Sequence, residues 1–204
     1  MFSPGMRVST APAADSRPMT SGIFLRKGDT QCITVASHAF PDTQEVFHPA
    51  PHGDKIGDII KRHPELDTAM VQLTPANSHR FTNNTYFQAE PPRRLALSSD
   101  ITPGTWFEAD GMNTGLLSFL CLGKALEKPA RPITDIPADE WKQSTFFNIF
   151  GTRSPQIMEG IYGAPLVEAG TGLVAGLLHS ANGVWAECAA LDDLVAERWG
   201  SRLG

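Results

Sequence analysis

Short runs of alternating apolar and polar residues, separated by Gly, Pro, Asn and Asp, recur along most of the chain. Runs of this kind predict β-strands, because successive side chains of a strand point to opposite faces of its sheet. The Lys27-Gly28-Asp29 segment is a short glycine-containing connection of the kind that joins two strands into a hairpin. In the first half of the chain, the pattern predicts strands at 22–26, 31–37, 45–48, 55–61 and 68–73, and one more near Phe87.

The second half repeats this rhythm and then changes its period. Its predicted strands lie at 106–109, 116–124, 145–150, 165–168, 173–180 and 184–189. The segment at 190–199 has a helical period instead, with Leu191, Leu194, Val195 and Arg198 on one face. Gly200 is placed to cap the end of that helix.

A polar connector that begins at Pro91-Pro92 and ends near Pro103-Gly104 is the best domain boundary in the chain. The predicted organisation is a flexible leader over 1–20, a first β-barrel over 21–92, a linker over 93–104 and a second β-barrel with the helix over 105–204. The expected fold class is therefore all-β, with two antiparallel six-stranded barrels and a short C-terminal helix.

Composition supports a turn-rich globular chain. Gly 18 and Pro 16 together make up one residue in six of the 204, which is too many for a helix bundle. Lys and Arg number 17 against 22 Asp and Glu, a net charge of −5, and no basic run exceeds two residues. Nucleic acid and membrane partners are therefore not expected, and no apolar stretch approaches the roughly 18 residues of a membrane span. The first 20 residues lack the apolar core of a secretory signal, so we expect a cytoplasmic protein.

Cysteine and histidine positions give no sign of a metal or cofactor. Cys32, Cys121 and Cys188 are odd in number and have largely apolar neighbours, which favours reduced thiols, although a bridge such as Cys32–Cys188 stays open. Neither a zinc-ligand spacing nor a phosphate-binding glycine loop is found, so no metal and no cofactor is expected. The histidines that lack such spacing are His48, His52, His63 and His79.

Three local motifs follow one another in an informative order. ITVASHAF ends a predicted strand at His38, ELDTAMVQL places Asp67 immediately before an apolar strand, and EGIYGAPLV is a turn containing Tyr162 that leads into another strand. Together they resemble the chymotrypsin-like peptidase superfamily, whose chain order is His, Asp, nucleophile. The resemblance extends from about residue 22 to 200. The third motif and the later GLLHSA are most similar to viral cysteine peptidases of the picornaviral and potyviral type, and to a group of uncharacterised fungal proteins.

The resemblance implies a role for each motif residue. His38 takes the position of the general base, Asp67 that of the residue that orients it, and Tyr162 that of the nucleophile. The backbone amides of Gly160 and Tyr162 correspond to the oxyanion hole. The last two residues, His179 and Ser180, correspond to a wall of the specificity pocket.

Tyr162 is where the sequence departs from the motif, which has Cys or Ser at this position. A phenol has an accessible pKa of about 10, but its oxygen lies about six ångströms from Cβ, beyond the position of a scissile carbonyl. The sequence therefore predicts a catalytically inactive peptidase homologue, a pseudoprotease that binds a protein or peptide or acts as a scaffold. Two alternatives stay open: an active serine or cysteine endopeptidase with a relocated nucleophile such as Ser37, Ser180 or Cys188, and a structural or assembly domain, viral or self-associating.

Each of these residues also has an ordinary structural explanation. His38 could be a surface histidine, Asp67 could cap a turn, and Tyr162 could be an aromatic of the core. His179 could be a histidine at a strand end, bonded to the backbone. The sequence alone leaves these explanations open, together with the partner and the oligomeric state.

Overall fold

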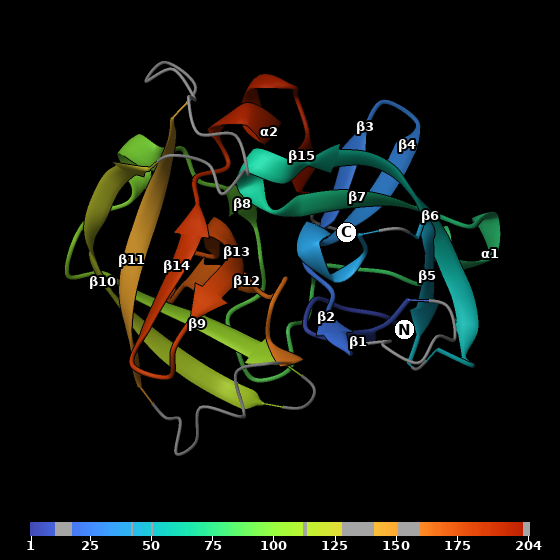
Figure 1. The fold of residues 1–204 in the computed structure, drawn as a ribbon, viewed down its shortest axis with the longest axis horizontal. Coiled ribbons are helices and arrows are strands. Elements are labelled where there is room, and N and C mark those ends of the chain that lie inside the picture. Colours follow the sequence, from blue (N-terminus) through green and yellow to red (C-terminus); the bar gives the residue numbers. More distant parts are fainter. Residues whose placement is uncertain are drawn as a thin grey trace.

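The computed structural model describes residues 1–10, 18–41, 43–49, 51–111, 114–127, 141–150 and 160–201. These residues form two groups of β-strands that lie side by side, with little helix (Figure 1). Three 3-10 turns, at Ser37–Ala39, Pro64–Leu66 and Ser98–Asp100, and two short α-helices, α1 (Pro75–Ser78) and α2 (Asp192–Ala196), complete the described elements.

The first group is an antiparallel sheet whose strand order is β15-β3-β4-β7-β6-β5. Four of the predicted strands overlap its members closely, and the strand predicted at 55–61 is longer than expected because β6 continues to His63. The pairings among described residues run from one edge strand to the other without joining the two edges, so closure into a barrel stays a prediction for this half. The members are β3 (Phe24–Lys27), β4 (Thr30–Ala36), β5 (Glu45–His48), β6 (Asp54–His63), β7 (Thr68–Leu73) and β15 (Gly200–Ser201).

The N-terminal segment belongs to this half, and the prediction of a flexible leader over 1–20 is wrong for its described residues. β1 (Arg7–Val8) pairs with β2 (Met19–Thr20), and Ser9 forms a bridge with Phe47 of β5. Val8 is fully buried and Met19 nearly so. The segment was missed because two-residue strands are too short to show an alternating pattern.

The second half is a closed six-stranded barrel. Its strands pair in the ring β12-β9-β10-β11-β14-β13, and β13 pairs back to β12. Every pairing in the ring is antiparallel, as expected for strands joined by turns. All six predicted strands of this half are present. They are β9 (Trp106–Gly111), β10 (Gly115–Glu127), β11 (Lys142–Phe150), β12 (Pro165–Glu168), β13 (Leu173–Ala181) and β14 (Trp185–Ala189).

The segment between the halves has more structure than the predicted linker over 93–104. β8 (Arg94–Leu95) pairs parallel with β13, and the Ser98–Asp100 turn is tied to Asp192 by the Ser98 amide and hydroxyl. The strand predicted near Phe87 is absent: Phe87 has a φ of 46° and lies in a turn. This part of the chain packs along the second barrel instead of pairing with the first sheet.

The C-terminal helix is shorter than predicted and does not end at Gly200. Arg198 adopts the left-handed conformation with φ 64°, the Trp199 amide bonds to the Leu194 carbonyl at 2.9 Å, and the Arg198 amide bonds to Val195. This bonding pattern is the Schellman motif, with arginine in the place usually taken by glycine. Gly200 is thereby released to begin β15, which pairs with β3.

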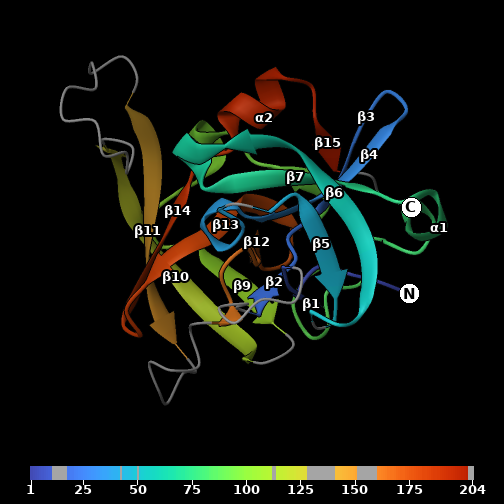
Figure 2. The ribbon, with the colours of Figure 1, turned by 45° about the vertical axis from the view of Figure 1, so that its right-hand side comes forward.

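A hydrophobic cluster joins the two halves. Ile23 and Leu25 from the first sheet pack in it with Val174 and Leu177 from the barrel and with Leu194 of α2. Because burying apolar surface stabilises a fold, these contacts hold the two halves together. The polar loops that end β4, precede β7 and precede β12 meet where the two halves approach (Figure 2).

Candidate functional site

His38 and Asp67 lie at neighbouring ends of two paired strands. β4 and β7 are antiparallel, and Ala36 faces Thr68 across the pair. His38 follows Ala36 in the 3-10 turn Ser37–Ala39, and Asp67 precedes Thr68. The end of one strand and the start of the other therefore bring the two residues together.

The predicted hydrogen bond between the two side chains is present. His38 Nδ1 lies 2.5 Å from Asp67 Oδ2, and the His38 backbone amide donates to Asp67 Oδ1 at 2.8 Å. The Ser37 amide donates to the Asp67 carbonyl, also at 2.8 Å. Asp67 also ends a 3-10 turn in the left-handed conformation, with φ 47°, which Asp tolerates better than most residues. Asp67 thus ends one 3-10 turn through its backbone amide and bonds His38 of the next through both carboxylate oxygens.

The turn that carries Tyr162 is held against the first half by Thr20 of β2. The Thr20 amide donates to the Tyr162 carbonyl at 3.1 Å, and its hydroxyl donates to the Gly160 carbonyl. Gly163 follows with φ +90°, and a Cβ there would lie 2.4 Å from the Thr20 carbonyl oxygen. Only glycine fits so close an approach. Thr20 could not be predicted from the sequence, because a lone threonine carries no motif.

The ring of Tyr162 stands beside His38. The two ring centroids are 5.4 Å apart with the planes at 77°, an edge-to-face contact. The phenol hydroxyl is 3.5 Å from the Ala181 carbonyl, a long hydrogen bond to the end of β13, and the half-buried ring packs on the core of the first sheet. Tyr162 is therefore a packed aromatic whose ring also contacts His38.

A pocket of about 440 Å³ lies beside this pair and has walls from both halves. His38, Asp67 and Glu65 line it from the first half, and the predicted wall residues His179 and Ser180 line it from the barrel. The volume is in the range of pockets that bind small molecules or side chains. Other barrel residues that line it are Glu127, Lys142, Ser144 and Glu187.

The barrel wall of the pocket is a hydrogen-bonded group of charged and polar side chains. His179 Nε2 lies 3.1 Å from Glu187 Oε1, and the Ser144 hydroxyl donates to the same oxygen at 3.0 Å. Burial raises the pKa of Glu187, but hydrogen bonds from His179 and Glu127 outweigh this effect and lower it to about 2. The hydrogen bond to Glu187 and burial raise the pKa of Glu127. When the pair takes up one proton, Glu127 therefore holds it in preference to Glu187.

His179 therefore bonds to the side chain of Glu187. A bond to the backbone, which was the ordinary structural explanation for this histidine, is not its contact here. Sequence reasoning missed Glu187, Glu127 and Ser144. Glu187 could have been noticed, because it is the one acidic residue of the otherwise apolar strand Trp185–Ala189.

Of the alternative nucleophiles, Cys188 is buried, whereas Ser180 lines the pocket. All three cysteines are free and buried, so no bridge joins Cys32 to Cys188. Burial raises the pKa of both thiols, that of Cys32 to about 12. Ser180 lines the pocket, and the Ser37 hydroxyl is 3.5 Å from Arg62. The thiols therefore lack the thiolate character that nucleophilic catalysis needs.

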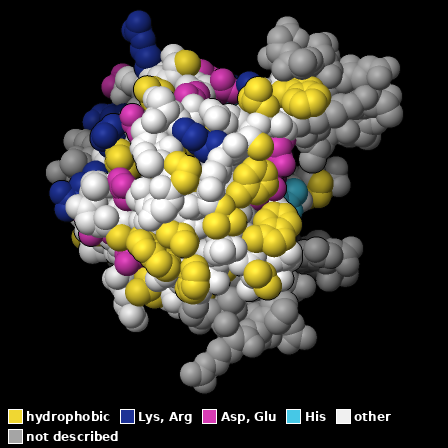
Figure 3. Space-filling model, turned by 90° about the vertical axis from the view of Figure 1, so that its left-hand side faces the viewer, with side chains coloured by type: hydrophobic (Ala, Val, Ile, Leu, Met, Phe, Trp, Pro, Cys, Tyr) yellow, Lys and Arg dark blue, Asp and Glu magenta, His cyan; other side chains and the backbone are white. Residues whose placement is uncertain are grey.

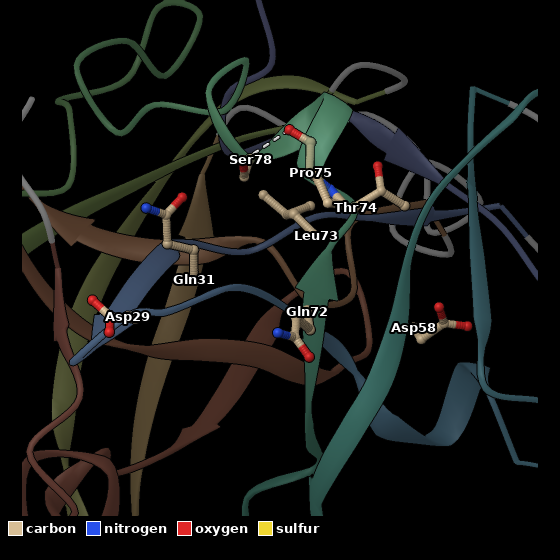
Figure 4. A pocket seen from close by; sticks show the side chains of 8 residues that line it. All are labelled: Asp29, Gln31, Asp58, Gln72, Leu73, Thr74, Pro75 and Ser78. Carbon is tan, nitrogen blue, oxygen red and sulfur yellow. Dashed lines mark hydrogen bonds between the residues drawn. The ribbon is translucent and has the colours of Figure 1, made fainter.

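A second cavity, of about 480 Å³, lies on the first sheet away from His38 (Figure 4). Asp29, Gln31, Asp58 and Gln72 surround it, and their side chains do not point toward a common centre. Asp58 is paired with Lys55 at 2.8 Å. This cavity has no arrangement of groups that resembles a reactive site.

In the described part of the chain, no three His, Cys, Asp or Glu side chains are grouped to hold a metal ion. His48 Nδ1 bonds to the Arg7 carbonyl at 2.6 Å, a structural contact. Among the same residues, no helix has the length and apolar character to cross a bilayer.

Comparison with known proteins identifies the fold. No family model and no curated protein matches the chain. Among solved structures, Thermobifida fusca Protease A matches with a TM-score of 0.69 at 13% identity, over 100% of this chain and 99% of that one. A glutamic-acid-specific serine protease that uses a histidine triad in substrate binding matches at 0.68 and 12%, over 98% and 100%. Cellulomonas bogoriensis chymotrypsin matches at 0.64 and 12%, over 100% of both chains. The chain therefore has the chymotrypsin-like fold of these serine proteases.

Proposed function

We propose that this chain is a catalytically inactive homologue of the chymotrypsin-like peptidases, which binds an extended peptide or protein segment in the cleft beside His38. The observation that carries the proposal is the position of Tyr162. Its ring lies 5.4 Å from the ring of His38, on the turn before β12 where the sequence motif has Cys or Ser. His38 then faces the edge of an aromatic ring whose hydroxyl is directed to the Ala181 carbonyl, and it has no Ser or Cys side chain at that position from which to take a proton.

The base and its orienting residue do not restore activity by themselves. In the serine peptidase mechanism, the histidine accepts a proton from the nucleophile while the nucleophile attacks the scissile carbonyl. The His38–Asp67 bond of 2.5 Å preserves half of this arrangement. Without the nucleophile, catalysis falls to the residual effect of binding and oxyanion stabilisation, about 10³–10⁴-fold over an uncatalysed reaction that is itself negligible.

Binding a peptide requires a complementary surface but no nucleophile, and we assign that role to the pocket beside His38. The cavity of about 440 Å³ is bounded by polar groups from both halves, and it adjoins the end of β13. Chains of this architecture accept extended peptides through main-chain hydrogen bonds along a strand, which requires no nucleophile. We also propose that the third motif derives from a peptidase of the viral cysteine type. The backbone amides of Gly160 and Tyr162 would then take the place of its oxyanion hole.

Labelling at position 162 tests the inactive site. The wild type is treated with a fluorophosphonate and a thiol-directed acylating probe, beside Tyr162→Cys and the double variant Tyr162→Cys, His38→Ala. We expect no labelling of the wild type, labelling of Cys at 162 in the single variant, and much slower labelling in the double variant. Peptide mass spectrometry locates the label. His38-dependent labelling of Ser180 in the wild type overturns the proposal and favours an active endopeptidase.

Peptide binding is tested with an array of unstructured peptides. Ser180→Trp fills the pocket from β13, and Ser78→Trp fills the cavity on the first sheet as the matched control. We expect the wild type and Ser78→Trp to bind the same peptides, and Ser180→Trp to lose them. Peptides that bind all three proteins equally contradict a role for the cleft.

A further inference from the structure

The outer surface of the barrel carries an apolar face that does not include His38, Asp67 or Tyr162. Side chains alternate between the inside and the outside of β9, β10, β11 and β14. One row across the four strands is Trp106, Leu120, Asn148 and Trp185, which are paired in register. We define the aromatic face as Trp106, Leu120, Leu122, Phe146, Phe150 and Trp185, arranged around Asn148.

These apolar side chains are more exposed than is usual for their type. Trp106 is 46% exposed, Leu122 50%, Phe150 45% and Trp185 37%, with Val184 at 67% on the rim. The rings of Trp106 and Phe150 contact each other, with centroids 5.1 Å apart. Figure 3 shows hydrophobic side chains gathered on this side of the molecule, the left of Figure 1.

The exposed area matches the apolar part of a stable interface. Trp106, Leu122, Phe150 and Trp185, with Val184 on the rim, expose about 450 Å², if a whole aromatic side chain contributes about 200 Å² and an aliphatic one slightly less. A standard interface takes about 800 Å² from each partner, of which about 450–520 Å² is apolar. The face and its rim together therefore supply the apolar core of one such interface, and they exceed the single scattered residues of an ordinary surface.

Two features of the face point to a second copy of this chain as the occupant. The row that crosses the four strands through Asn148 has no ionised side chain, so a two-fold axis at Asn148 places no charge on the axis. The nearest acidic side chain on the same outer side, Glu187 opposite Phe146, is bonded to His179 and Ser144. At its centre is Asn148, between Phe146 and Phe150 along β11 and opposite Leu120 and Trp185 on the neighbouring strands. An asparagine amide has both donors and an acceptor, so two copies of it can pair across a two-fold axis, which a wholly apolar partner could not provide.

We propose that the aromatic face is a homodimer interface, with Asn148 next to the two-fold axis. Each face buries its aromatic side chains against those of the other copy, sheet against sheet, and Asn148 fixes the register in the way that single buried asparagines do in coiled coils. The dimer does not depend on the cleft, because His38 and Tyr162 are not part of this face.

Mass measurement tests the interface first. Sedimentation velocity of the full chain, over about 1–100 μM, is expected to give twice the monomer mass of 22.1 kDa. Trp106→Glu and Phe150→Glu are each expected to weaken self-association at least 100-fold. The control is Ile60→Glu on β6 of the first sheet, which has a similar exposure of 48% and should stay dimeric. Circular dichroism of each variant establishes that it is folded.

Asn148→Cys tests the predicted symmetry. Residues next to a two-fold axis approach their own copy, so mild oxidation is expected to give a disulfide-linked dimer on a non-reducing gel. Ile60→Cys is expected to stay monomeric on the same gel. A wild type of monomer mass at every concentration overturns the proposal, as does a dimer that survives Trp106→Glu and Phe150→Glu. A dimer that Asn148→Cys fails to cross-link overturns the placement of the axis.

Discussion

The first sheet and the second barrel contribute to the cleft in opposite ways. The first sheet supplies His38 and Asp67 in an arrangement that a working peptidase could use, with two hydrogen bonds between them. The barrel supplies the turn that carries Tyr162, whose ring makes an edge-to-face contact with His38. His38 and Asp67 depend for their positions on strands β4 and β7, which pair independently of residue 162. The geometry of the pair is therefore set by the first sheet alone, whatever side chain stands at 162, and it is weak evidence of activity.

The largest effect is expected where the two halves touch at the turn. In Gly163→Ala, the new Cβ would lie 2.4 Å from the Thr20 carbonyl oxygen and 3.0 Å from the Ala36 nitrogen, at a φ of +90°. We expect a loss of about 3 kcal/mol or more in the free energy of unfolding, or a fall in Tm of about 6–12 °C.

The matched control for this substitution is Gly170→Ala. Gly170 has a φ of +81° and nothing within 4 Å of its Cβ position, so only the left-handed strain of about 1–2 kcal/mol is expected. Equal losses of Tm in the two variants would show that the contact with Thr20 does not hold the turn.

An intermediate effect is expected from the first sheet's side of the cleft. Asp67→Ala removes the acceptor for the His38 side chain and backbone and leaves alanine at a φ of 47°. We expect a loss of about 1–2 kcal/mol, measured by urea unfolding. Asp67→Asn, which tolerates the same conformation and retains an acceptor, should lose about half as much. If Asn is as damaging as Ala, the charge is more important than the geometry.

The smallest effect concerns the carboxyl pair in the pocket wall. Because Glu187 raises the pKa of Glu127, protonated Glu127 stabilises the fold below its unfolded pKa of about 4.3. That stabilisation is lost as pH rises through the folded pKa. Glu127→Gln should therefore stabilise the protein at pH 7, by less than about 1 kcal/mol, and give no gain at pH 4.

Asp29→Asn is the control for the change in net charge, because Asp29 is exposed in the turn between β3 and β4. Thermal unfolding of both variants at the two pH values gives the measurement. A gain in Tm from Glu127→Gln that is the same at both pH values excludes proton sharing with Glu187 as its cause.

Local pattern predicted the long strands and the motif residues, and long-range pairing accounts for what it missed. Strands at 45–48, 68–73 and 165–168 have the predicted bounds, because their alternation and flanking turns are complete in the sequence. β1, β2 and β15 are two residues long, and only their distant partners make them strands. The same holds at the site. His38 follows and Asp67 precedes strands that could be predicted. Thr20 acts through Gly160 and Tyr162, far along the chain, and Glu187 joins the distant Ser144 to His179.

The pairing of β15 with β3 sets the order in which the chain can fold. Gly200 pairs with Arg26 and Ser201 with Leu25, so the edge of the first sheet is completed by residues synthesised after the whole barrel. Contacts this distant in sequence slow folding, since the intervening chain must be ordered before they can form. On the ribosome, the barrel strands emerge while β3 still has an open edge, and an open strand edge is a template for aggregation. A nascent chain of this protein therefore needs its edge at β3 protected until residue 201 has left the exit tunnel.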